Sequence, residues 1–173
     1  MSNMNQTVSD RINQWDLPQD VADIISDTDI NLMSELFGGI ETADELIKFV
    51  RKNLGTWYAV QIDEDDNDWG FGSYNKDEAI EMAAQRNALK VAVIEMGSDP
   101  TCIDEIYMYD SFRVSAISED GSNVDNDIVY DAGASAVAAE LASTREWYEG
   151  REPAYYLVSY YRDGKPYRTE KIR

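Results

Sequence analysis

The sequence predicts an α+β protein, with a mostly antiparallel sheet, helices on one face of that sheet and an N-terminal helical segment. The first 55 residues carry apolar side chains at helical spacing, whereas short aromatic and β-branched runs alternate with turns from residue 56 onwards. The predicted elements follow the order helices, hairpin, helix, strands, helix and hairpin, which is typical of this class. We therefore expect residues 1–55 to form the helical segment and residues 56–173 to form the α+β domain.

The helical segment contains three predicted helices. Thr42 and Glu45 have the spacing of a capping box, and the run ADELIKFVRKNL behind Thr42 places its apolar residues on one stripe. Two shorter helices are predicted upstream, within residues 17–27 and 29–39, and turn residues close each of them.

The α+β domain begins with a predicted hairpin over residues 56–73, in which TWYAVQID and WGFGS are the strands and DEDDND is the turn. Asn75 and Glu78 then form a second capping-box pattern. The run that follows predicts one long helix over residues 76–96, which ends at Gly97.

The remainder of the chain predicts two strands, a polar loop, a small-residue helix and a final hairpin. The strands cover residues 103–110 and 111–118, the loop covers 119–127, and the helix covers 134–148. The last hairpin turns at Asp163–Gly164, a strong two-residue turn signal. Both hairpins open with an aromatic and aliphatic strand and carry an acidic residue at the turn, which is too little to predict a repeat.

Charge is the unusual property of the sequence. The chain has 34 acidic and 15 basic residues, a net charge of −19 and a pI near 4.1. Residues 1–131 hold 28 acidic and 8 basic residues, while residues 132–173 hold 6 and 7. Such a surface repels nucleic acid and anionic membranes and attracts basic proteins. We therefore expect a basic partner protein, no direct binding of nucleic acid and no membrane association.

Several classes of chemistry are disfavoured. The chain contains no histidine, which removes the usual hydrolase triads and most zinc sites. The single cysteine, Cys102, stands near Asp99, Asp104 and Glu105, whose negative charge disfavours a reactive thiolate. We predict that the protein is not an enzyme and has no cofactor, although a catalytic carboxylate pair remains an alternative among so many acids.

No apolar run reaches the length of a membrane span, so we expect a cytoplasmic protein.

The DEDDND stretch has part of the pattern of a calcium-binding loop. Asp63, Asp65 and Asn67 occupy the first, third and fifth ligand positions of an EF-hand. However, Asp68 stands at the sixth position, where the motif has glycine, and Tyr74 stands at the twelfth, where it has glutamate. The sequence therefore predicts no metal site, and it favours a solvated acidic turn at this hairpin.

Acidic stretches and composition together suit one class of binding protein. DEDDND, IDE and EDGSNVDND, in a small acidic chain without histidine, resemble the phage and mobile-element DNA mimics, such as anti-restriction and anti-CRISPR proteins. The resemblance implies stoichiometric inhibition of a host defence nuclease, by blocking its DNA or guide-RNA channel in the host cytoplasm. Carboxylates would meet lysine and arginine of the nuclease, and aromatic residues would anchor the contact. The expected partner-binding residues are Asp63, Glu64, Asp65, Asp66, Asp68, Trp69, Tyr74, Asp77, Glu78 and Glu81.

Two other interpretations of the acidity remain open. Aspartate outnumbers glutamate, 20 to 14, and lysine is scarcer than arginine, 6 to 9, as in proteins adapted to high salt. The uneven distribution of charge argues against salt adaptation. Alternatively, the chain is an acidic interaction or immunity-type module for a basic partner unrelated to nucleic acid.

Overall fold

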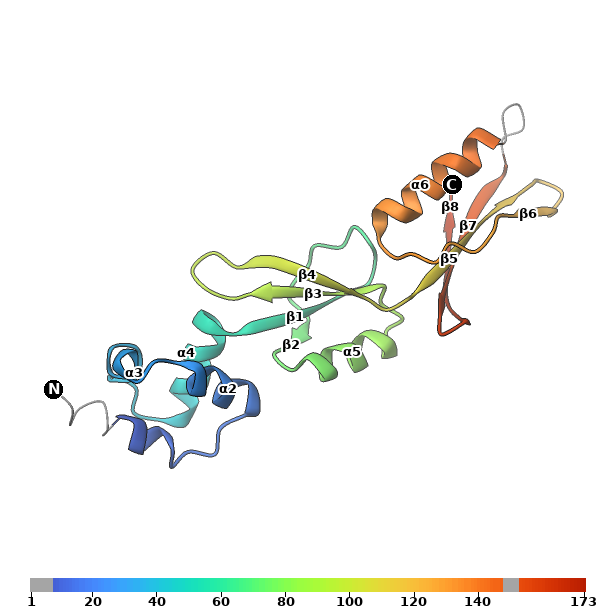
Figure 1. The fold of residues 1–173 in the computed structure, drawn as a ribbon. Helices are drawn as coiled ribbons and strands as arrows, with labels where there is room; N and C mark the ends of the chain where they lie inside the picture. The colour runs from blue at the N-terminus through green and yellow to red at the C-terminus, as the bar shows by residue number, and fades with distance from the viewer. Residues whose placement is uncertain (1–7, 148–152) are drawn as a thin grey trace.

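The computed structural model describes residues 8–147 and 153–173, and it consists of a helical unit followed by two antiparallel sheets (Figure 1). The fold is α+β with an N-terminal helical segment, as the sequence predicts. The strands form two separate four-stranded sheets, a division that the hydrophobic pattern alone did not indicate. Among the described residues, no helix combines the length and the apolar character needed to cross a membrane.

The helical unit comprises residues 8–54 and has its own apolar core. A short helix over residues 8–12 precedes α2 (Gln19–Asp27), α3 (Ile30–Phe37) and α4 (Ala43–Leu54). The predicted capping box at the start of α4 is present, since the side chain of Thr42 accepts from the backbone of Glu45 and the Glu45 carboxylate accepts from the backbone of Thr42. The core of this unit is formed by Val8, Ile12, Val21, Ile25, Met33, Phe37, Leu46 and Val50.

The sheet A unit, residues 56–110, follows the helical unit. Its strands have the spatial order β2-β1-β3-β4, and all neighbours are antiparallel. One helix, α5, covers one face of this sheet through Ala79 and Ala83, which pack with Val60 and Val91. The elements are β1 (Thr56–Gln61), β2 (Gly72–Ser73), α5 (Lys76–Gln85), β3 (Lys90–Glu95) and β4 (Thr101–Tyr107).

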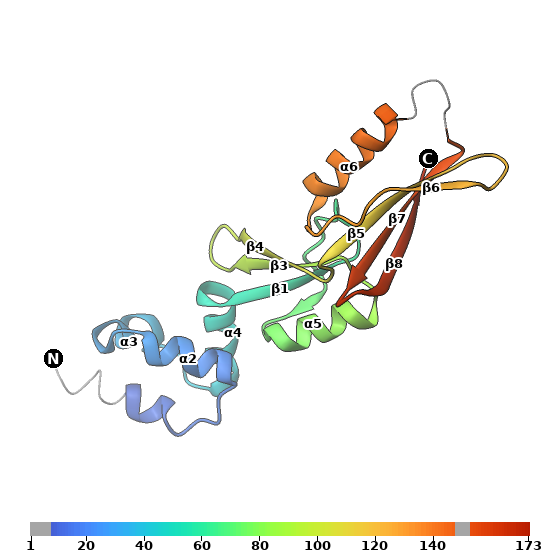
Figure 2. The same cartoon turned by 45° about the vertical axis from the view of Figure 1, so that its right-hand side comes forward.

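The sheet B unit, residues 111–173, has the strand order β6-β5-β7-β8, again with antiparallel neighbours (Figure 2). The predicted turn at Asp163–Gly164 is confirmed, because both residues have positive φ, as a tight two-residue hairpin requires. The elements are β5 (Ser111–Ile117), β6 (Asn123–Asp125), α6 (Ala134–Trp147), β7 (Tyr155–Arg162) and β8 (Lys165–Ile172).

The two sheet units have the same topology. Each consists of a hairpin, a helix and two more strands, and in each the second strand lies at one edge and the fourth at the other. The two hairpins compared in the sequence are not equivalent, since β1–β2 opens its unit and β7–β8 closes the other. The fold therefore contains a repeat of the ββαββ type that side-chain patterns did not reveal.

The predicted helix over residues 76–96 is wrong in its second half. Helix α5 ends at Gln85, and residues 90–95 form β3. Asn87 has a φ of 51°, and the amide of Ala88 returns to the carbonyl of Ala83, so the chain leaves the helix through a left-handed turn. The Val-Ala-Val-Ile run that follows then favours a buried strand.

Candidate functional site

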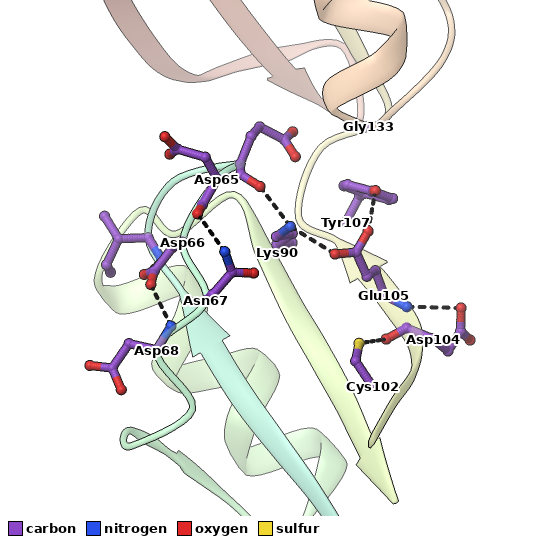
Figure 3. Close-up of polar contacts among 12 residues, drawn as sticks. Asp65, Asp66, Asn67, Asp68, Lys90, Cys102, Asp104, Glu105, Tyr107 and Gly133 are labelled. Carbon is purple, nitrogen blue, oxygen red and sulfur yellow. Dashed lines mark hydrogen bonds and ion pairs between the residues drawn. The ribbon is translucent and has the colours of Figure 1, made fainter. Parts of the chain in front are cut away.

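The acidic loop between β1 and β2, residues 62–71, folds back over the face of sheet A opposite α5 (Figure 3). Trp69 packs against the small cluster on that face, and its carbonyl accepts a 2.8 Å hydrogen bond from Trp57 Nε1. The ammonium of Lys90 on β3 donates to the carbonyl oxygen of Glu64 at 2.7 Å. The loop is therefore held against the sheet, and it does not project as a free hairpin tip.

Two of the loop carboxylates stabilise the loop itself. Asp66 accepts from the amides of Ile62 at 3.1 Å and of Asp68 at 2.9 Å, and Asp68 accepts from the amide of Gly70 at 2.8 Å. Such side-chain to backbone bonds are how aspartate satisfies a turn. The carboxylates of Asp66 and Asp68 therefore stabilise the conformation of the loop. Within the described residues, no three acidic or cysteine side chains converge so that they could hold a metal ion.

Asp63 lies at the contact between the two sheet units. Its carboxylate pairs with the guanidinium of Arg168 on β8, which also pairs with Glu170 and donates to the carbonyl oxygens of Ile62 and Asn87. The side chain of Arg168 is only 19% exposed. Because four oxygen acceptors surround this one guanidinium, the pairing of Asp63 is a structural link between units.

Glu64 is half-buried at the same junction. Its Oε1 accepts from the hydroxyl of Tyr109, whose oxygen accepts in turn from the amide of Gly133 at 2.8 Å. Its Oε2 is buried and has no hydrogen-bond partner among the described residues. Burial raises the pKa of the Glu64 carboxyl, against the opposing effects of Tyr109 and Lys90. A carboxylate with one unpaired oxygen is therefore held in a partly desolvated place.

Glu105 on β4 lies on the other side of Lys90 and has the opposite environment. Lys90, which is only 6% exposed, donates to Glu105 at 2.7 Å, and the hydroxyl of Tyr107 donates to the same carboxylate at 2.6 Å (Figure 3). These hydrogen bonds, that of Lys90 first, lower the pKa of Glu105. Sequence reasoning missed this cluster, although a lysine at the start of an apolar strand was a signal for a buried cation.

The acidic residues of α5 lie on the opposite side of sheet A from the loop. Asp77, Glu78 and Glu81 are exposed there. Asn75 caps the helix by accepting from the amide of Glu78, but the carboxylate of Glu78 accepts from the hydroxyl of Ser73 instead of closing a capping box. The structure therefore does not bring the two predicted acidic sets together on one surface. They flank the sheet on both sides.

The predicted aromatic anchors are half-buried. Tyr74 packs edge-on against Trp57, with ring centroids 4.8 Å apart, and the guanidinium of Arg51 lies 5.1 Å from the Tyr74 ring. Trp69 packs on sheet A. By contrast, Tyr130 is 84% exposed, and it directly precedes Asp131 and follows Asp127 by three positions in the segment that leads to α6. Sequence reasoning missed Tyr130, because the pattern around it does not distinguish an exposed tyrosine from a buried one.

Most of the acidic charge of the sheet A unit has no cationic partner. Residues 56–110 hold 13 acidic and 3 basic residues, and one of the three, Lys90, is buried. Another, Arg86, lies 3.6 Å from the centre of the Phe71 ring. In the part of the chain that the structure describes, the exposed carboxylates of this unit without an ion pair include Asp65, Asp68, Asp77, Glu81, Glu95, Asp99 and Asp104.

Comparison with known proteins gives no match to a protein-family model, to a curated protein or to a solved structure. The inference of function therefore depends on the site itself. What the site can do chemically is present fixed negative charge on both sides of a narrow sheet, with each carboxylate held on a regular element or a hydrogen-bonded loop.

Proposed function

We propose that the protein is a stoichiometric inhibitor that occupies the nucleic-acid channel of a host defence nuclease, of the anti-restriction or anti-CRISPR kind, in the cytoplasm. The observation that carries the proposal is the set of exposed, unpaired carboxylates on both sides of sheet A. Asp65 lies on the loop side, where Asp68 is also exposed although it accepts from the amide of Gly70, and Asp77 and Glu81 lie on the helix side. Basic side chains that normally contact phosphates would contact these carboxylates instead.

The magnitude of the charge supports this proposal. A six-residue strand such as β1 or β3 spans roughly 20 Å. Duplex DNA of that length carries about 12 charges. The 13 acidic and 3 basic residues of the sheet A unit leave a net charge of −10. The net charge of this unit is thus similar in size to that of a duplex segment as long as one of its strands, and its placement on two sides suits a channel with two basic walls better than a flat surface.

Specificity for one nuclease requires contacts other than charge. Tyr130 fits this role, because an exposed tyrosine beside Asp131 and close to Asp127 offers both a ring face and carboxylates to an arginine of the partner. Trp69 and Tyr74 contribute indirectly in this proposal, by holding the loop and the start of α5 in place.

The alternative proposal is an acidic interaction module, of immunity type, whose basic partner does not bind nucleic acid. The observation in its favour is that Asp63, Asp66 and Asp68 take part in structural contacts, which leaves less charge free at the loop than the sequence predicts. The two proposals differ in whether nucleic acid competes with the protein for its partner.

The first experiment is capture of partners from lysates that contain restriction and CRISPR effectors, followed by elution with duplex DNA or guide RNA. We expect one nuclease to be captured and then displaced by its own nucleic acid. The triple variant Asp65→Asn, Asp77→Asn, Glu81→Gln should capture much less of it. The control variant Asp16→Asn, Asp27→Asn, Glu35→Gln removes the same charge from exposed positions of the helical unit and should capture as well as the wild type. Capture that nucleic acid does not displace would support the alternative.

A further inference from the structure

The junction of the two sheet units contains an open pocket of about 760 Å³. Its walls are the first residues of the acidic loop, the first two turns of α6 and strand β8. Figure 1 shows the β1–β2 loop rising beside the start of α6. A volume of this size is within the range of pockets that bind small organic molecules.

The floor of the pocket is aliphatic. Val137, Ala138 and Leu141 line it from α6, and Ile172 lines it from β8. Val137 is buried in the core of the sheet B unit, whereas Ala138 is exposed and faces the open space. Such a floor offers apolar contact to a hydrocarbon body about as long as one or two helical turns, but no hydrogen bonds.

The rim of the pocket carries more negative than positive charge. Asp63, Glu64, Asp65 and Glu170 line it, together with two cations, Arg168 and Lys171. The six side chains leave two negative charges in excess when all of them are ionised.

The two cations are already engaged. Arg168 is surrounded by two carboxylates and two backbone carbonyls, and the ammonium of Lys171 lies 3.8 Å from the centre of the Tyr155 ring. By contrast, the buried Oε2 of Glu64 has no partner within the described residues, and Asp65 is exposed without an ion pair. A buried carboxylate oxygen without a donor is costly, and a bound donor would remove that cost.

We propose that this pocket is a binding site for a small organic cation, an ammonium or guanidinium group on an aliphatic body. The cationic group donates to Glu64 and Asp65 after a small movement of the loop, and the aliphatic body lies on Val137, Leu141 and Ile172. An anion would be repelled by the excess carboxylates, and a wholly apolar molecule would leave Glu64 unsatisfied. This inference does not depend on the proposed function, because none of its steps involves a partner protein.

The test uses the full chain and hexylammonium as the probe. Methyl resonances of Val137, Leu141 and Ile172 are followed by NMR during titration, and affinity is measured by calorimetry. We expect saturable shifts at these three methyl groups. Methylammonium, which lacks the aliphatic body, and hexanoate, which carries the opposite charge, should each bind at least about tenfold more weakly.

Two variants with matched controls assign the binding to the pocket. Glu64→Gln keeps an acceptor for Tyr109 but removes the charge, and we expect an affinity about tenfold lower. Asp99→Asn removes the same charge outside the pocket and should bind as the wild type. Ala138→Trp fills the pocket from an exposed position and should abolish binding, whereas Ala139→Trp, also exposed on α6 but outside the lining, should not.

Three results would overturn the proposal. The first is equal or tighter binding of hexanoate, which would make the pocket an anion site. The second is hexylammonium binding that survives Ala138→Trp, which would place the cation elsewhere on this acidic surface. The third is markedly tighter binding of Nα-acetyl-lysine methylamide, which would assign the pocket to a lysine side chain of a protein and not to a small free cation.

Discussion

The two sheet units share one topology but differ in what their residues do. The sheet A unit has a net charge of −10 and a helix that packs through alanine. The sheet B unit has 11 acidic and 8 basic residues, and its core contains Tyr156 and Tyr160, against which Tyr109 of the sheet A unit also packs. Strand order and charge are therefore independent properties of this fold. One copy of the repeat can carry a charged surface while the other contributes the large aromatic core.

Backbone crowding should distinguish the two units most strongly. A Cβ on Gly72 in β2 would lie 2.0 Å from the carbonyl oxygen of Tyr58, whereas a Cβ on Gly164 would meet nothing within 4 Å but has a φ of +70°. We expect Gly72→Ala to lower the free energy of unfolding by about 3 kcal/mol, and Gly164→Ala to lower it by about 1 kcal/mol. Urea denaturation followed by circular dichroism measures both. Equal losses would mean that β2 can shift away from β1 without cost.

The second contrast concerns arginine at the junction and arginine within one unit. Arg168 joins the two units through Asp63 and Glu170, whereas Arg113 lies 3.9 Å from Asp125 and is 33% exposed. Replacing Arg168 with methionine should cost about 2 kcal/mol, because it leaves carboxylates and carbonyls without their donor. The same change at Arg113 should cost less than about 1 kcal/mol. A similar cost at both sites, measured by denaturation, would show that the junction is held mainly by apolar contacts.

The pH dependence of stability should have opposite signs at Glu64 and Glu105. Burial raises the pKa of Glu64 above its ordinary value of 4.5, so the stabilisation from its protonated form is complete below that value and is lost as pH rises through the folded-state pKa. Hydrogen bonds lower the pKa of Glu105, so its stabilisation is present above 4.5 and is lost as pH falls through the lowered pKa.

Glutamine variants measure this contrast. Relative to the wild type, Glu64→Gln should gain stability as pH rises from about 4 to about 7. Glu105→Gln should lose most at neutral pH, and its loss should shrink in acid. Thermal melts across this range, with the surface variant Asp99→Asn as the control, would show the two trends. Parallel trends for both variants would contradict the assigned environments.

A change in salt concentration should have the smallest effect on the stability of the protein. Screening of the unpaired carboxylates of sheet A should raise the melting temperature by a few degrees between low and high potassium chloride. Burial of the three apolar cores does not require salt, so the chain should stay folded without it. Unfolding at low salt would instead support adaptation to high salt as the origin of the acidity.

Sequence signals within a few neighbouring residues predicted much of the secondary structure. They did not predict which strands pair with one another. The capping box at Thr42 and the Asp163–Gly164 turn were predicted because each depends on a few neighbouring residues. The end of α5 was missed because alanine and lysine in its continuation favour a helix, while pairing of β3 with β1 and β4 favours a strand. The division into two sheets depends on which strands pair, which composition does not encode locally.

The candidate site, like the fold, was predicted only as far as local sequence signals allow. The sequence located the acidic stretches, but it did not distinguish free carboxylates from those that serve the loop or the junction. Asp66 caps backbone amides and Asp63 pairs with a residue more than a hundred positions away. The exposure of Tyr130 and the burial of Lys90 likewise depend on tertiary packing.

A competition titration tests most directly the proposal that the sheet A unit competes with nucleic acid for the channel of a nuclease. The captured nuclease is loaded with labelled duplex, and the wild-type protein and its triple variant at Asp65, Asp77 and Glu81 are titrated in. We predict full displacement at one inhibitor per nuclease by the wild type, and displacement at least about tenfold weaker by the variant. A stable complex of inhibitor, nuclease and duplex, or equal displacement by both proteins, would contradict the claim.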